Sequence, residues 1–116
     1  MFDPTFLAAV LDSLNQPILV AGTDHKTLYM NKAAIAYYKG GTSLLGQSLL
    51  ECHNPESQQK IIAILAAFEG GEDECLYAEN EQRRMYMHSV RDPHGALIGY
   101  YEWYYWKDGA SLPGDR

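Results

Sequence analysis

Two adjacent side chains that can bind a ligand or a metal, Cys52 and His53, lie in the stretch Glu51-Cys-His-Asn-Pro-Glu-Ser57. Neutral imidazole is a good ligand for haem iron, so His53 is a candidate axial ligand. Cys52 could ligate haem or react covalently if the helix that starts just beyond it stabilised its thiolate. In the structural interpretation, which the local signals slightly favour, the cysteine packs as a small hydrophobic residue and the histidine bonds to the backbone near the helix cap.

The overall composition limits the other kinds of chemistry. The 116-residue chain has a formal charge of −6 and no run of lysine or arginine, which disfavours binding to nucleic acid. Its two cysteines and four histidines show neither a Cys-x-x-Cys nor a His-x-x-x-His spacing. We find no nucleophile with a spaced base and no phosphate-binding glycine loop, and therefore expect a protein that is not an enzyme.

The apolar segments and the cysteine usage indicate a compartment. No apolar run approaches the ~20 residues that span a bilayer. Residues 1–17 lack a basic start and carry an early acidic residue, unlike a secretory signal peptide. Two free thiols fit a reducing compartment. We therefore expect a single cytoplasmic domain without membrane contact.

Periodicity and capping residues predict the elements that must position Cys52 and His53. Asp3 begins a helix whose apolar positions repeat at helical spacing, and Asn54 caps a longer helix that ends at Gly70. Asn31 caps a short helix between these two and ties it to the preceding strand. The predicted strands are 18–21 and 27–30, which form a hairpin, and then 75–78, 84–90 and 96–106.

This order of elements predicts an α+β fold, with a five-stranded antiparallel sheet, helices on one face and an amphipathic helix at the N-terminus. An arrangement of this kind tends to leave a pocket between the sheet and the helices. We divide the chain into an N-terminal amphipathic helix (1–15), a domain that holds the sheet and the other helices (16–106) and a flexible tail (107–116).

The last strand, Tyr100-Tyr-Glu-Trp-Tyr-Tyr-Trp106, carries aromatic residues on both of its faces. One face must meet the core, so either 100, 102, 104 and 106 or the complementary set lies on the outer face of the sheet. Exposed aromatic side chains at this density indicate a covering surface, which the N-terminal helix can supply from the same chain or from a partner chain. We favour a homodimer built around this face, rather than tyrosines that simply tolerate exposure.

Several short motifs follow one another along the chain. They are Pro17-Ile-Leu-Val20, Leu28-Tyr-Met-Asn31-Lys-Ala-Ala34, Gly46-Gln-Ser-Leu49, Arg91-Asp-Pro-His-Gly95 and Ile98-Gly99. Their order and spacing resemble the PAS domain family over residues 5–106. Cys52-His53-Asn-Pro55, together with Glu102, is similar to the Cys-His-Pro-Pro variant of bacterial and archaeal PAS modules. The Asp-Ile-Thr ending that couples many PAS domains to an output helix is missing, so we expect output through another chain or through the N-terminal helix.

The resemblance implies a sensory module that binds a small ligand or cofactor and signals to a downstream partner. The candidate cofactor is haem with His53 as its ligand, and the other candidate ligand is an apolar metabolite. Flavin is disfavoured, because the thiol of Cys52 is displaced along the chain from the position at which flavin-type PAS domains carry their cysteine. The residues expected at the pocket are Cys52 and His53 at its edge, with Leu49, Ile61, Leu65, Met85 and Met87 along its walls. The alternative is a structural PAS domain whose core is filled by its own side chains and which only mediates dimerisation or protein-protein interaction.

Overall fold

The computed structural model describes residues 3–107, apart from the side chain of Cys52. In chain order, its helices, 3-10 helices (η) and strands are α1 (Pro4–Asp12), β1 (Leu19–Gly22), β2 (Thr27–Met30), α2 (Lys32–Tyr37), η1 (Gly41–Leu44), η2 (Leu49–Cys52), α3 (Pro55–Glu69), β3 (Glu74–Glu79), β4 (Arg83–Arg91) and β5 (Leu97–Trp106). Each predicted strand and the two later helices are present close to their expected bounds, whereas the first helix, expected to continue to residue 15, ends at Asp12. The predicted tail, 107–116, lies outside the described residues except for Lys107.

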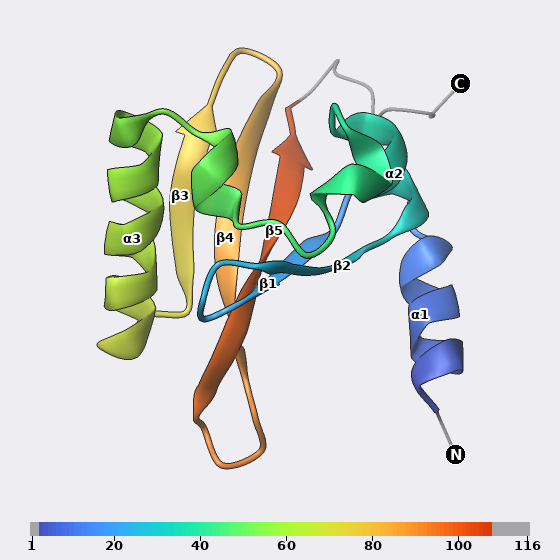
Figure 1. The fold of residues 1–116 in the computed structure, drawn as a ribbon, viewed down its shortest axis with the longest axis horizontal. Coiled ribbons are helices and arrows are strands. Elements are labelled where there is room, and N and C mark those ends of the chain that lie inside the picture. The colour runs from blue at the N-terminus through green and yellow to red at the C-terminus, as the bar shows by residue number, and fades with distance from the viewer. Residues whose placement is uncertain (1–2, 108–116) are drawn as a thin grey trace.

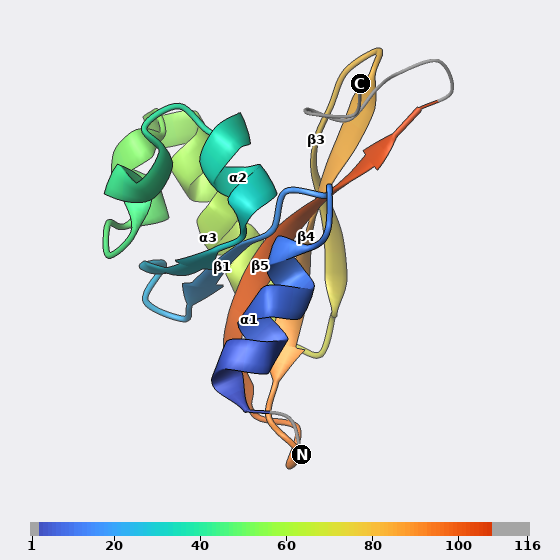
Figure 2. The same ribbon diagram turned by 90° about the vertical axis from the view of Figure 1, so that its right-hand side faces the viewer.

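The strands form one antiparallel sheet in the order β2-β1-β5-β4-β3, so the last strand of the sequence lies at the centre. β1 and β2 are the predicted hairpin. The helices α2 and α3 and the segment between them gather on one side of this sheet (Figures 1 and 2). The prediction of an α+β fold, with five antiparallel strands and helices on one face, is confirmed.

Asn31 joins the first hairpin to the helices. Its side-chain oxygen accepts hydrogen bonds from the backbone N–H groups of Ala34 at 2.9 Å and Ile18 at 3.0 Å. Its amide nitrogen donates to the carbonyl oxygens of Leu11 and Gln16 at 2.9 and 2.8 Å. A fully buried amide with all these partners fixes the start of α2 against β1, as the predicted cap and tie require.

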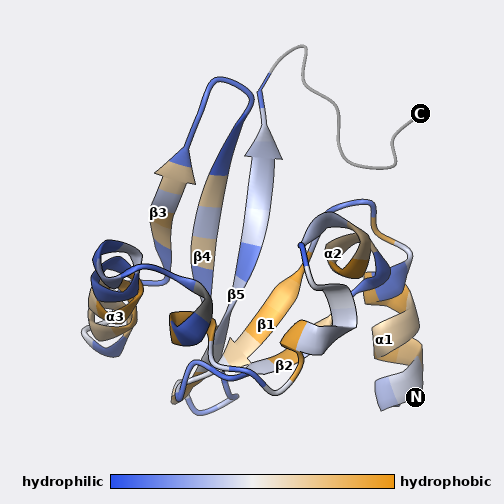
Figure 3. Ribbon diagram, turned by 45° about the horizontal axis from the view of Figure 1, so that its top comes forward, coloured by the Kyte–Doolittle hydropathy of each residue, from blue (hydrophilic) through white to orange (hydrophobic). Residues whose placement is uncertain are grey.

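The core lies between the inner face of the sheet and the helices. α3 contributes Ile61, Ile64 and Phe68, whose spacing places them on one helix face. β1 is among the most hydrophobic segments, whereas β5 has the near-neutral hydropathy of its tyrosines (Figure 3). Burial along β5 therefore depends on which face a residue occupies and not on its hydropathy alone.

β5 divides its aromatic residues between the two faces of the sheet. Tyr100, Glu102 and Tyr104 are buried on the inner face. On the outer face, Trp103 stacks on Tyr86 with ring centroids 5.0 Å apart. The complementary set proposed from the sequence, 101, 103 and 105, is therefore the outer one, as expected for alternation along a strand.

A close approach between β1 and β5 sets the register of the site. Gly22 and Gly99 face each other in the ladder. A Cβ atom at position 99 would collide with the carbonyl oxygen of Ala21, so only glycine fits this position. With Gly99 opposite Gly22, the antiparallel ladder brings Glu102 opposite Leu19 and so into the interior.

The first helix, α1, lies beside β2, on the opposite side of the molecule from β3 (Figure 1). The Tyr29 hydroxyl, 3.0 Å from an Asp12 carboxylate oxygen, anchors it there. The apolar side chains of Leu7, Val10 and Leu14 remain 42% to 50% exposed. Helix α1 therefore does not cover the outer face of β4 and β5 from within the same chain, and cover from a partner chain stays a prediction.

Candidate functional site

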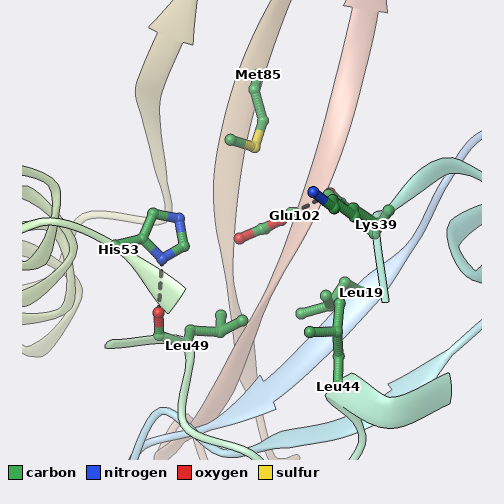
Figure 4. Close-up of a pocket in the computed structure, with 8 residues that line it drawn as sticks. Leu19, Lys39, Leu44, Leu49, His53, Met85 and Glu102 are labelled. Atoms are coloured by element: carbon green, nitrogen blue, oxygen red, sulfur yellow. Dashed lines mark hydrogen bonds between the residues drawn. The ribbon is translucent and has the colours of Figure 1, made fainter. Parts of the chain in front are cut away.

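A cavity of about 370 Å³ lies between the inner face of the sheet and the segment that joins α2 to α3. Its lining residues are Leu19, Tyr38, Lys39, Leu44, Leu49, His53, Met85 and Glu102. Figure 4 shows the His53 ring and the Glu102 carboxyl group pointing toward one another from two sides of this space. An enclosure with mostly apolar walls and a few convergent polar groups is the usual form of a small-molecule site.

His53 is placed by two consecutive caps. Ser48 caps η2, and Asn54 caps α3 by accepting a hydrogen bond from the Ser57 N–H at 2.8 Å. Between them, Nδ1 of His53 lies 2.6 Å from the carbonyl oxygen of Leu49. Because a carbonyl oxygen only accepts, Nδ1 carries the proton, and the neutral ring therefore has an unprotonated Nε2. That second nitrogen lies on the side of the ring that faces Glu102 (Figure 4).

Glu102 is a carboxyl group buried in the middle of β5 and is only 4% exposed. It pairs with Leu19 of β1 and Met87 of β4, so its side chain leaves the strand among apolar neighbours. The Tyr38 hydroxyl donates a hydrogen bond to Oε1 at 2.7 Å. Burial raises the pKa of Glu102, while the Tyr38 hydrogen bond and the electrostatic interaction with His53 oppose that rise. The carboxyl group therefore keeps its proton to a higher pH than it would in water.

The tyrosines extend this network away from the cavity. The hydroxyl oxygens of Tyr38 and Tyr104 are 2.7 Å apart. Because Tyr38 gives its own proton to Glu102, Tyr104 is the donor in that pair. Gln16 in turn donates from Nε2 to the backbone oxygen of Tyr104. Hydrogen bonds thus run from the cavity wall across β5 to the segment that follows α1.

Comparison with known proteins gives the family. The sequence matches the family model described as "PAS fold" over residues 11–105. The chain belongs to the PAS family. This confirms the resemblance to the PAS family that the sequence motifs indicated. Sequence comparison with curated proteins gives no match.

Solved structures agree with this PAS domain in fold. The C-terminal domain of a Streptococcus mutans protein has a TM-score of 0.74 and 20% identity, over 89% of this chain and 84% of that one. The PAS domain of Bordetella pertussis BvgS has a TM-score of 0.65 and 16% identity, over 89% and 85% of the two chains. A sensory box sensor histidine kinase from Vibrio cholerae has a TM-score of 0.62 and 16% identity, over 89% and 90%.

The residues expected at the PAS pocket fall into two groups. Leu49, His53 and Met85 line the cavity. Ile61 and Met87 belong to the buried core, and Leu65 packs against that core, so the structure does not bring these three to the cavity wall. Cys52 was predicted at the edge of the pocket, but its side chain is outside the described part of the structure.

Sequence reasoning left five lining residues out of the site: Leu19, Tyr38, Lys39, Leu44 and Glu102. Glu102 carried a usable signal, because it is the one charged residue in an otherwise aromatic run that must bury one face. Tyr38 gave no comparable signal, since it follows α2 in a backbone conformation that only the structure shows to turn its side chain inward.

The residues of the cavity meet one requirement of a haem site but not the others. His53 is oriented through its Nδ1 hydrogen bond, as the ligands of metals usually are. A volume of about 370 Å³ is near the lower end of ligand cavities, which span about 300–1,000 Å³, and Glu102 projects into the same space. We conclude that this cavity suits a ligand smaller than a tetrapyrrole.

No group of three or more His, Cys, Asp or Glu side chains in the described part of the chain could hold a metal ion. None of the described helices is long and apolar enough to cross a bilayer.

Proposed function

We propose that this PAS domain is a cytoplasmic sensory module that binds a small, mostly apolar ligand between its sheet and helices. It acts by binding rather than by catalysis, and it relays the presence of the ligand through dimer or partner contacts. The single observation that supports ligand binding is the cavity of about 370 Å³, whose apolar walls enclose two convergent polar groups. Open space of this size argues against the alternative, a PAS domain with a filled core that only mediates assembly.

The hydrogen bonds of the site support a route for the signal. Glu102 in the cavity is joined through Tyr38 to Tyr104, and Gln16 binds the backbone of Tyr104 just after α1. A ligand that competes with Tyr38 for the carboxyl group changes this chain of contacts. The expected output is therefore a shift of α1, the helix whose apolar side faces solvent.

Native mass spectrometry of the purified protein tests ligand binding. We expect a bound species of small mass, without the Soret band that haem would give. Met85→Trp places a large ring in the cavity and should abolish the bound mass. Ile62→Trp introduces the same ring at a 42% exposed position on α3 and should leave the bound mass in place.

The outcomes separate the candidate functions. A protein that carries no bound mass and takes up nothing from a metabolite mixture would leave assembly as the function. A Soret band that is lost in His53→Ala would replace the small ligand by haem.

Dimer contacts through α1 and the outer sheet face complete the proposal. They are supported by the exposed side chains of Leu7 and Val10 on α1 and of Leu14 just after it, which continue one apolar stripe at helical spacing. Light scattering during gel filtration should show a dimer that becomes a monomer in Val10→Glu. Thr5→Glu adds the same charge to α1 outside this stripe and should stay dimeric; a monomeric wild-type protein would contradict the proposal.

A further inference from the structure

The polar atoms that face the cavity indicate the chemical class of its ligand. The proton of His53 is on Nδ1, which binds the Leu49 carbonyl group, and no described residue offers a donor to Nε2. Glu102 uses Oε1 for Tyr38, and its Oε2 likewise has no partner among residues 3–107. When Glu102 is ionised, each of these two atoms is thus an acceptor with nothing to accept from within the described chain.

Both acceptors open onto the cavity. Both His53 and Glu102 line the cavity. Figure 4 shows the ring and the carboxyl group facing one another across this space. A ligand can therefore reach both of them at once.

Two facing acceptors require a ligand with several donors. A primary ammonium group has three N–H donors and carries the positive charge that a buried carboxylate needs. A carboxylate ligand would instead bring a second negative charge and no donor. We propose that the cavity binds a small primary amine, whose ammonium group lies between Glu102 and His53 and whose apolar part fills the remaining space. This inference rests on the proposed function, which is ligand binding in the same cavity.

The walls of the cavity fit the rest of such a molecule. Leu19, Leu44 and Met85 supply apolar surface, and a volume near the lower end of ligand cavities suits a short or branched alkyl amine. Lys39, the basic residue of the lining, is exposed and makes no ion pair with Glu102. The buried carboxyl group therefore remains available to the ligand.

The surroundings of Glu102 couple amine binding to pH. The titratable groups that face it are His53 after η2, Tyr38 and Lys39 at the end of α2, and Tyr100 and Tyr104 on β5. From β1 and β4 it meets only Leu19 and Met87 in the ladder. Burial raises the pKa of Glu102, and a bound ammonium group lowers it again. Affinity for the amine should therefore fall as the pH falls through the pKa of the empty site.

Three probes with similar carbon skeletons test the chemical class: isopentylamine, isopentanol and isovalerate. Binding is followed by chemical-shift changes of the uniformly labelled full chain at pH 7.5. The amine should bind at least about tenfold more tightly than the alcohol, because charge-assisted hydrogen bonds are the stronger ones. Isovalerate should bind more weakly than either.

Matched variants assign the preference to Glu102. Glu102→Gln keeps the shape of the side chain and an oxygen for Tyr38, so it should lose the preference for amine while it still binds isopentanol. Glu81→Gln makes the same change at an exposed position between β3 and β4 and should behave as the wild type. Retained isopentanol binding shows that the cavity of the variant is intact.

Two results would overturn the inference. If isopentanol or isovalerate binds as tightly as the amine, the assignment of an amine fails while ligand binding itself stands. If none of the three probes binds, the amine assignment also fails, and the native mass measurement alone decides whether the cavity holds another ligand.

Discussion

The two faces of β5 have almost the same composition and opposite roles. On the inner face, Tyr100 and Tyr104 flank Glu102, and all three are buried. On the outer face, Tyr101 stacks on His88 with ring centroids 5.3 Å apart, next to the stacked pair of Trp103 and Tyr86. Alternate residues of one strand thus belong to a polar network in the interior and to an aromatic ladder at the surface.

This contrast shows how burial assigns roles to similar side chains. A phenol in the interior must give its hydroxyl group a partner, because an unpaired buried polar group is costly. That requirement joins Tyr104 to Tyr38 and Tyr38 to Glu102. A phenol at the surface can leave its hydroxyl group in water and use only its ring. The inner face is therefore suited to hold a ligand, and the outer face to pack against another surface.

The largest expected difference between the faces is in the free energy of unfolding of adjacent alanine variants. Tyr104 is 2% exposed, and Tyr104→Ala should cost about 3–5 kcal/mol, as large core truncations do. Tyr105 is 48% exposed, and Tyr105→Ala should cost less than about 1 kcal/mol. Urea unfolding followed by circular dichroism measures both, and equal losses would show that the faces do not differ as described.

A smaller effect is expected from one hydroxyl group of the inner network. Tyr38→Phe leaves Tyr104 and Glu102 without their shared partner, so it should cost about 1–3 kcal/mol. The control is Tyr37→Phe, since the hydroxyl group of Tyr37 makes no hydrogen bond within residues 3–107 and its loss should be nearly neutral. If urea unfolding gives the same small change for both variants, the network does not stabilise the fold.

A third effect, which depends on pH, comes from the protonation of Glu102. Burial raises its pKa in the folded protein above the value of about 4.3 in an unfolded chain. Between these two values the folded state binds more protons than the unfolded state, so stability falls as the pH rises. Thermal unfolding from pH 4 to 8 should show this loss in the wild type relative to Glu102→Gln. Parallel curves for the two proteins would place Glu102 in a solvated environment instead.

Much of the fold could be predicted from the sequence because local chemistry determines it. Asn31 and Asn54 cap their helices as their sequence context indicates, and both faces of the last strand follow from alternation. The length of α1 was overestimated: it ends at Asp12 with Ser13 as its cap, although the apolar spacing continues to Leu14. Apolar spacing alone does not show where the tertiary contacts that stabilise a helix end.

The candidate site was harder to predict because its residues meet only through tertiary structure. His53, Leu49 and Met85 were expected at the cavity from the order of motifs, and they line it. Glu102 and Tyr38 are 64 positions apart, and their hydrogen bond depends on the register that Gly99 sets and on the turn after α2. No periodicity within one segment contains that information.

The smallest expected effect concerns the stacked pair Tyr86 and Trp103 on the outer face. Their rings are 5.0 Å apart and inclined by 18°, which is a stacked arrangement. Aromatic pairs contribute about 0.5–1.5 kcal/mol beyond the area they bury, so a double-mutant cycle with Tyr86→Leu and Trp103→Leu should give a coupling in that range. The cycle is best measured in the Val10→Glu background, because a partner chain over this face would add its own contacts to the coupling. A coupling that appears in the wild type but vanishes in the Val10→Glu background would mean that the aromatic stacking on the outer face depends on the second chain. A single chain would then organise the inner face of β5 but not the outer one.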